Sequence, residues 1–208
     1  MVVAGLADHV LAHRDRGGRA FLVTGPIGSG KTTGVLALTG ELRGRGLSVA
    51  GVASPRVLQD GETVGYRVRD LATGEEFPLC SREPPGIAFR KFFFSPDGLA
   101  FANAALRRAA GEAAAILVDE VGPLELAGGG FAPGMRAALS SPAFLVLTVR
   151  PSLVDEVRAW AGLPAATPVW ALSPTGADIR RMGDHRVPGI GKSWRRLCSI
   201  DWGGSIGL

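Results

Sequence analysis

The chain has 208 residues, of which 46% are hydrophobic and 20% are charged. This composition predicts one large globular domain and excludes a largely disordered chain. The 23 basic and 19 acidic residues leave a net charge of +4, which by itself favours a polyanionic partner. The two cysteines lie far apart and form no disulfide or metal-binding pattern, so we expect a cytoplasmic protein. No apolar run is long enough to span a membrane, and we expect no membrane partner.

The first quarter of the chain alternates helical and strand patterns around a glycine-rich turn. Apolar residues stand at helical spacing over 3–15, and residues 31–43 continue as a second helix. Apolar stretches at 20–24 and 47–53 predict strands. The glycine-rich sequence 25–32 therefore joins a strand to a helix.

Residues 55–95 follow a different pattern. Short stretches of alternating polarity are separated by turn dipeptides at Asp60-Gly61 and Thr73-Gly74, which are typical of β-hairpins. We interpret this segment as a β-rich insertion within the main domain, not as a second domain.

The remainder of the chain returns to alternating helices and strands. Ser95 is placed to cap a helix that has Pro96 in its first turn. The predicted elements, in chain order, are a helix over 95–111, a strand over 115–118, a helix over 133–140, a strand over 144–149, a helix over 151–161 and a strand over 169–172. Such alternation predicts an α/β fold, a three-layer sandwich with a mostly parallel sheet covered by helices on both faces.

The positive charge is concentrated at the C-terminal end. Residues 180–208 contain six basic and two acidic residues, whereas residues 1–179 contain equal numbers of each. We therefore divide the chain into an α/β domain over 1–179 and a basic C-terminal extension over 180–208. The neutral domain argues against nucleic-acid binding, and the extension, with Trp194 and Trp202 among its basic residues, leaves that partner open. A monomer is the expected state.

The strongest motif is GPIGSGKT at 25–32, which matches the phosphate-loop consensus GxxxxGK[ST] in full. Its glycines let backbone N–H groups turn toward phosphate oxygens, and the helix that follows offers its positive N-terminus to the same charge. Lys31 is placed to contact the β- and γ-phosphates, and Thr32 to bind Mg²⁺. Only three lysines occur in the chain, which argues against a chance match. The predicted nucleotide-binding residues are Gly25, Pro26, Ile27, Gly28, Ser29, Gly30, Lys31, Thr32 and Thr33.

A second motif follows the apolar run 115–118. A buried strand there carries Asp119 to the carboxyl edge of the sheet, where ligands bind in open parallel sheets. Asp119 is the predicted partner of Thr32 in holding Mg²⁺, through a water molecule. Glu120, one residue further, is placed to orient or deprotonate an attacking water. The alternative is a solvated acidic pair at the end of a strand.

Two arginines are weaker candidates for the same site. Arg150 ends the strand over 144–149 and is predicted to emerge beside Asp119, where it either stabilises transition-state charge or caps the strand. Arg56 follows the second strand and is a further candidate for the cleft.

Other conspicuous side chains favour structural roles. His9 and His13 stand at a metal-binding spacing, but we expect two exposed histidines on an amphipathic helix. The three phenylalanines at 92–94, after Lys91, form either a base-stacking platform or part of the core and an edge. Cys80 has no neighbour in the sequence that would activate a thiol.

Taken together, these residues resemble a known family. The segments GPIGSGKT, GETVGYRVRDLATGEE, KFFFSPDGLAFANAAL, VDEVGPLEL and LVLTVR are similar to the small thermophile-type nucleoside triphosphatases, a group that includes the human cancer-related nucleoside triphosphatase. The resemblance covers about residues 19–172. DEVGPLEL discriminates best, since many functions share a phosphate loop.

The resemblance implies a P-loop fold of the RecA-like or kinase-like type that hydrolyses ATP, GTP and other nucleoside triphosphates with Mg²⁺ and little base preference. It assigns Mg²⁺ to Thr32 and Asp119 and water activation to Glu120. Glu125 belongs to the family signature without an assigned role. Pro123 stands where many members have a lysine.

Three functions agree with these motifs. The first is a Mg²⁺-dependent nucleoside triphosphatase in which Lys31, Glu120 and Arg150 are the catalytic residues. The second is a small-molecule or nucleotide kinase on the same fold. The third is a binding module controlled by its nucleotide, which the basic extension motivates.

Overall fold

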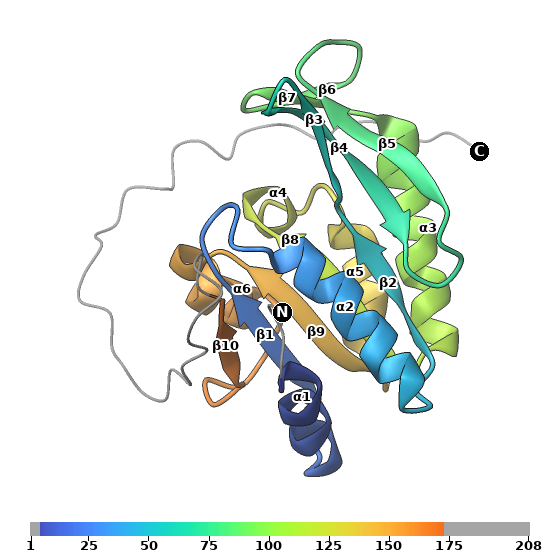
Figure 1. Ribbon diagram of the computed structural model, residues 1–208, viewed down its shortest axis with the longest axis vertical. Helices are drawn as coiled ribbons and strands as arrows, with labels where there is room; N and C mark the ends of the chain where they lie inside the picture. Colours follow the sequence, from blue (N-terminus) through green and yellow to red (C-terminus); the bar gives the residue numbers. More distant parts are fainter. Residues whose placement is uncertain (1–4, 173–208) are drawn as a thin grey trace.

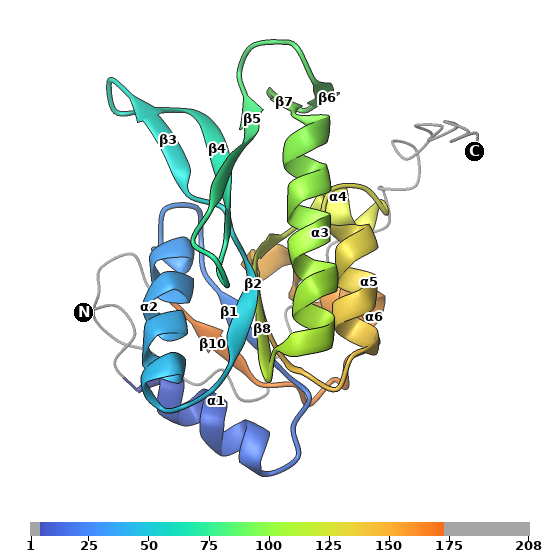
Figure 2. The same ribbon diagram turned by 90° about the vertical axis from the view of Figure 1, so that its right-hand side faces the viewer.

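The computed structural model describes residues 5–172 of the chain. Their strands form one ten-stranded sheet in the order β10-β1-β9-β8-β2-β4-β5-β7-β6, with β3 paired to β4. Helices cover both faces of the central part (Figures 1 and 2), which confirms the predicted three-layer α/β fold. The predicted extension over 180–208 lies outside the described residues. The binding-module hypothesis depends on that extension, so the structure does not test it.

Five neighbouring strands, at the end of the sheet that begins with β10, are parallel. They are β1 (Ala20–Thr24), β2 (Val49–Ala53), β8 (Ala115–Val121), β9 (Phe144–Val149) and β10 (Val169–Ala171). All residues of β1, β2 and β9 are buried. Burial on both faces explains why these strands appear in the sequence as nearly continuous apolar runs.

The insertion continues this sheet with five antiparallel strands. They are β3 (Arg56–Gln59), β4 (Glu62–Asp70), β5 (Glu76–Ser81), β6 (Ile87–Phe89) and β7 (Phe92–Phe94). The join is the antiparallel pairing of β2 with β4, where Val52 faces Asp70. The predicted hairpin insertion is therefore present, and Figure 2 shows it extending from the parallel strands with α3 alongside it.

Helices connect and cover the parallel strands. They are α1 (Leu6–Asp15), α2 (Lys31–Gly44), α3 (Pro96–Glu112), α4 (Pro123–Leu126), α5 (Ala132–Ser140), the 3-10 helix η1 (Pro151–Leu153) and α6 (Val154–Trp160). The Ser95 hydroxyl accepts a hydrogen bond from the Gly98 N–H at 3.1 Å, so the predicted cap of α3 is confirmed. No helix within residues 5–172 is both long and apolar enough to cross a bilayer.

The structure corrects two expected boundaries and adds one helix. The strand expected over 115–118 continues to Val121, so Asp119 and Glu120 lie inside it. The single helix expected over 151–161 is a 3-10 turn followed by α6. The short helix α4 was not expected. It has Pro123 in its first turn and only four residues, too few to show a helical period.

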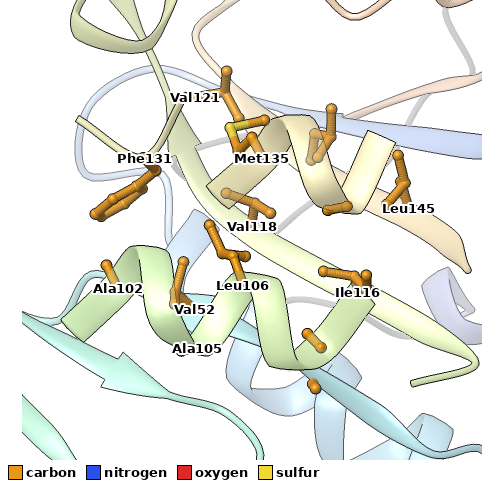
Figure 3. Packing of buried hydrophobic residues seen from close by; sticks show 14 of the residues in the cluster. Val52, Ala102, Ala105, Leu106, Ile116, Val118, Val121, Phe131, Met135 and Leu145 are labelled. Atoms are coloured by element: carbon orange, nitrogen blue, oxygen red, sulfur yellow. The ribbon is translucent and has the colours of Figure 1, made fainter. Parts of the chain in front are cut away.

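Strand residues alternate between two hydrophobic cores. In β8, Ile116 and Val118 face α3 and α5, where they join Leu106 and Met135 (Figure 3). Leu117 points the other way, into the cluster formed with α1 and α2. This period of two follows from the pleat of a strand. Both faces of the central sheet are thereby held rigid beneath the carboxyl ends of the strands.

The histidines of α1 pack against the second of these cores. His9 packs on Trp170 with ring centroids 4.6 Å apart, and His13 lies edge-on to Phe21 and Phe144. Both side chains are half-buried, so the expectation of two exposed histidines is wrong. The cause is the return of β10 beside β1, a contact between opposite ends of the described chain. Within residues 5–172 no cluster of potential ligands suits a metal ion held by three or more acidic, histidine or cysteine side chains.

Candidate active site

The phosphate loop runs from the end of β1 to the start of α2. Gly28 and Gly30 have φ angles of 82° and 88°, a left-handed conformation that favours glycine. Gly25 is required for a different reason, since a Cβ atom there would lie 2.9 Å from the backbone oxygen of Leu172. The loop therefore needs the glycines of its motif both for its path and for its packing.

Lys31 folds back over this loop. Its Nζ donates hydrogen bonds to the backbone oxygens of Gly25 at 2.8 Å and Pro26 at 3.0 Å. Burial lowers the pKa of Lys31, and the nearby carboxylates of Glu120 and Asp119 oppose that shift. The amine is thus held at the centre of the loop with two acidic side chains close by.

The remaining residues of the loop differ in exposure. Ser29 is buried, whereas Pro26, Ile27 and Gly28 are exposed, and Ile27 retains 69% of its accessible surface. Thr33 is also exposed, on α2 beyond the loop. Thr33 therefore lies on the surface of the helix, next to the loop.

Asp119 is buried beside the loop, with 1% of its surface exposed. Its Oδ1 accepts a hydrogen bond from the Thr148 hydroxyl at 2.7 Å, and its Oδ2 accepts one from the Ser54 N–H at 3.2 Å. Burial raises the pKa of Asp119, while hydrogen bonds from Thr32, Thr148 and Ser54 counteract that shift. The alternative of a solvated acidic pair is therefore wrong for Asp119.

Strand β8 has an irregular register where it carries the two acidic residues. Val118 pairs with Leu147 and Val121 with Val149, so the two residues between them face Thr148 alone. This is the geometry of a β-bulge. Glu120 has a φ of 65°, a conformation that is strained for a residue with a side chain. Asp119 and Glu120 thus point to different partners although they are adjacent.

Thr148 forms hydrogen bonds to both residues of the bulge, Asp119 and Glu120. Its hydroxyl accepts a hydrogen bond from the Glu120 N–H at 2.6 Å and donates the one to Asp119. The side chain is fully buried in β9. Sequence reasoning missed this residue. The available signal was a lone hydroxyl in the apolar run FLVLTV.

Glu120 and Arg150 form an ion pair across the end of the sheet. Arg150 Nη2 lies 2.6 Å from Glu120 Oε1, and each side chain is about one-third exposed, at 32% and 31%. The predicted emergence of Arg150 at the carboxyl edge is therefore observed, with Glu120 as its contact.

Glu125 is a buried carboxylate that organises the chain after β8. Its Oε2 accepts from the Gly122 N–H at 3.0 Å and its Oε1 from the Phe131 N–H at 3.2 Å. It thereby holds the start of α4 and the approach to α5. Burial raises its pKa to about 7. These contacts give Glu125 a structural role, which is enough to account for its presence in the sequence signature.

A cavity of about 500 Å³ opens between the phosphate loop and the insertion. Ile27, Glu120 and Arg150 line its inner side, and Arg56 lines it from β3. The expectation that Arg56 faces the cleft agrees with this placement. Cys80 is part of the wall, and burial raises its pKa to about 11, as befits an unreactive thiol.

Comparison with known proteins identifies the group to which this site belongs. The family model described as NTPase matches residues 20–163. The nucleoside-triphosphatase THEP1 of Thermococcus kodakarensis is 36% identical over 143 residues, which cover 66% of this chain and 79% of the relative. THEP1 of Thermofilum pendens is 37% identical, over 62% of this chain and 72% of the relative.

Two solved structures of nucleoside triphosphatases also resemble this chain. The human cancer-related nucleoside triphosphatase matches with a TM-score of 0.53 and 28% identity, over 68% of this chain and 84% of that one. THEP1 from Aquifex aeolicus has the same fold, with a TM-score of 0.58 and 24% identity, over 75% of this chain and 91% of that one. Because the family model spans more than half of the chain and includes the phosphate loop, Asp119, Glu120 and Arg150, the chain belongs to the NTPase family and is an enzyme of the nucleoside-triphosphate hydrolase class.

Proposed function

We propose that the protein hydrolyses nucleoside triphosphates to the diphosphate and phosphate, with Mg²⁺ and with broad tolerance of the base. The observation that carries the proposal is the meeting of three groups at one edge of the sheet. The phosphate loop with Lys31, the buried carboxylate of Asp119 and the partly exposed carboxylate of Glu120 come together there. These are the groups that phosphoryl transfer to water requires.

The residues present fit Mg²⁺. Asp119 is buried, and no ion pair within residues 5–172 neutralises it. The Thr32 hydroxyl, which is near enough to Asp119 to lower the pKa of that carboxyl, supplies a second oxygen. Mg²⁺ prefers oxygen ligands and is usually held by few protein groups together with water and substrate phosphates. When bound, Mg²⁺ neutralises charge on the β- and γ-phosphates.

In the proposed reaction the chain positions charge and water. Backbone N–H groups of residues 28–32 and the N-terminus of α2 bind the phosphates. Lys31 exchanges its contacts with the loop carbonyls for phosphate oxygens. Glu120 orients the attacking water toward the γ-phosphorus. Arg150 holds the Glu120 carboxylate through the observed ion pair and adds positive charge near the transferred group.

The strained backbone of Glu120 supports this assignment. A left-handed glutamate costs of order 1–3 kcal/mol and persists where the surrounding structure imposes it. Here the hydrogen bond from its N–H to Thr148 does so. The bulge separates the Glu120 side chain from Asp119, so Asp119 would hold Mg²⁺ while Glu120 remains available to water.

Rates with ATP, GTP, CTP and UTP, each with Mg²⁺ and with excess chelator, test the proposal. We expect all four to be hydrolysed at rates of the same order, since the proposed contacts are to phosphates. Chelation should abolish turnover, and added Mg²⁺ should restore it. Undiminished phosphate release in chelator would contradict the metal role. A strong preference for a single base would contradict the broad specificity.

The Thr148→Val substitution tests the bulge. The variant keeps the shape of the side chain but leaves Asp119 Oδ1 and the Glu120 N–H without their partner. We expect hydrolysis to fall about tenfold or more and the free energy of unfolding to fall by about 2 kcal/mol. Phosphate release and urea denaturation measure the two effects. Thr148→Ser, which retains the hydroxyl, should restore most of both. Full activity of the valine variant would show that the hydroxyl does not position the carboxylates.

A further inference from the structure

The cavity beside the phosphate loop is large enough to hold a small molecule and not only the attacking water. Its volume of about 500 Å³ falls within the range of roughly 300–1,000 Å³ that is usual for small-molecule sites. Strands of the insertion form its outer wall, and Glu120 and Arg150 form the inner wall. The phosphate loop contributes Ile27, whose side chain is exposed although apolar. The cavity thus adjoins the place where the proposed function puts the γ-phosphate.

Positive charge predominates in the lining. The basic side chains are Arg56, Arg90, Lys91 and Arg150. Against them stand Glu120, which is paired with Arg150, and Glu125, which is buried among backbone N–H groups. None of the ion pairs formed within residues 5–172 involves the first three basic residues. Three cations without a carboxylate partner favour an anionic ligand.

Aromatic rings form much of the remaining wall. They are Tyr66, Phe89, Phe92, Phe94 and Phe131. Lys91 Nζ lies 5.3 Å from the centroid of Phe92, and the Arg90 guanidinium carbon lies 5.7 Å from that of Phe89. Rings next to cations suit a ligand that carries both a flat aromatic group and an anion.

Arg150 supplies a further indication. Its Nε is buried and has no hydrogen-bond partner within the described chain, while its Nη2 contacts Glu120. A buried donor without a partner is unfavourable. A ligand in the cavity cannot reach the buried Nε itself, but the exposed third of the side chain lines the cavity and can bind an anionic oxygen.

We propose that this cavity binds a nucleoside monophosphate and that the enzyme transfers the γ-phosphate of a nucleoside triphosphate to it. The ligand combines an aromatic base with a phosphate, the two features that the rings and the unpaired cations complement. The proposal rests on the proposed function only in placing the γ-phosphate at the phosphate loop.

The transfer balances without any other reactant. An oxygen of the monophosphate attacks the γ-phosphorus and forms a new P–O bond. The bond from that phosphorus to the oxygen bridging it to the β-phosphate breaks, and its electron pair leaves with the donor. One triphosphate and one monophosphate become two diphosphates. The second pKa of such a phosphate is about 6, so the attacking oxygen is already ionised at neutral pH. The ion-paired Glu120 is not needed as a base on this route.

The test uses GTP that carries radioactive phosphorus in its γ-phosphate, incubated alone and with AMP, CMP or UMP. Hydrolysis yields labelled inorganic phosphate, whereas transfer yields labelled ADP, CDP or UDP. We expect a labelled diphosphate to form at the expense of labelled phosphate. Labelled phosphate without any labelled diphosphate would overturn this inference and leave the hydrolase proposal intact. Absence of both products would contradict the hydrolase proposal.

Binding is measured separately at Tyr66, the only tyrosine of the chain. With isotope-labelled tyrosine, its ring gives a single side-chain NMR signal from within the cavity. We expect AMP, CMP or UMP to shift this signal in a saturable manner. An unchanged signal at saturating monophosphate would overturn the proposed site.

A matched pair of variants ties the transfer to the cavity. Arg90 has a φ of 56°, which asparagine tolerates well. The double substitution Arg90→Asn and Lys91→Ser should therefore remove two charges without strain. We expect it to weaken monophosphate binding about tenfold or more and to reduce labelled diphosphate more than labelled phosphate. The control, Arg107→Asn with Arg136→Ser, removes two charges from exposed helical positions outside the cavity and should change neither. Equal effects of the two double variants would overturn the inference.

Discussion

Lys31→Ala is expected to lower kcat/KM for every nucleoside triphosphate by about 10³-fold or more and to weaken nucleotide binding. The reason is the position of its Nζ, which is held at the centre of the phosphate loop by the carbonyls of Gly25 and Pro26. A cation buried there attracts the negative charge that develops on the phosphates. The attraction is strong because the surroundings screen electrostatic interactions poorly. No other lysine is part of the loop.

Stability should change little in this variant, since the lost hydrogen bonds are offset by removal of a partly buried charge. Thermal unfolding checks this point, and steady-state phosphate release with nucleotide titration measures the main effect. Arg107→Ala is the control, because it removes one positive charge from the exposed face of α3. Substantial turnover by the Lys31 variant would contradict the role given to the loop.

Glu120→Gln is expected to lower kcat by about 10²-fold or more while nucleotide affinity remains close to that of the unchanged protein. Glutamine has the shape of glutamate and fits the same bulge, but it orients water weakly and loses the ion pair with Arg150. Asp119, Lys31 and the loop keep their contacts in this variant. The loss should therefore affect turnover and not binding.

The Arg150→Gln substitution tests whether Arg150 acts through its ion pair with Glu120. If Arg150 acts partly by holding Glu120, the substitution should slow the unchanged enzyme more than it slows the Glu120→Gln variant. Phosphate release by the two single variants and the double variant gives this comparison. A normal rate in Glu120→Gln would exclude its action on water. Strictly additive effects would exclude positioning through the ion pair.

Local sequence patterns were sufficient for most of the fold. The buried strands β1, β2 and β9 are nearly continuous apolar runs, and the cap of α3 lies at Ser95 as expected. Errors occurred where distant segments determine the outcome. The extent of β8 depends on pairing with β9 up to Val149, and the environment of His9 depends on Trp170. Such contacts leave no periodic signal near the residue concerned.

The same distinction applies to the candidate site. The phosphate loop was identifiable because its function resides in consecutive residues whose glycines have to adopt particular backbone angles. Asp119 and Glu120 were identifiable from the apolar run before them. Thr148 was not, because its importance arises only when β9 pairs beside β8 and places one hydroxyl opposite two residues of a bulge.

By itself, then, the sequence determined the α/β class, the phosphate loop with Lys31, and the acidic pair that follows a buried strand. Only the tertiary structure decided that Glu120 pairs with Arg150, that Thr148 joins both acidic residues, and that the insertion encloses a basic, aromatic cavity beside the loop. The physical reason is the range of the interactions. Backbone geometry and apolar periodicity act between neighbours in the chain. A bulge, an ion pair between β8 and the residue after β9, and a cavity arise from segments tens of residues apart, and their relative placement follows from the packing of the whole sheet.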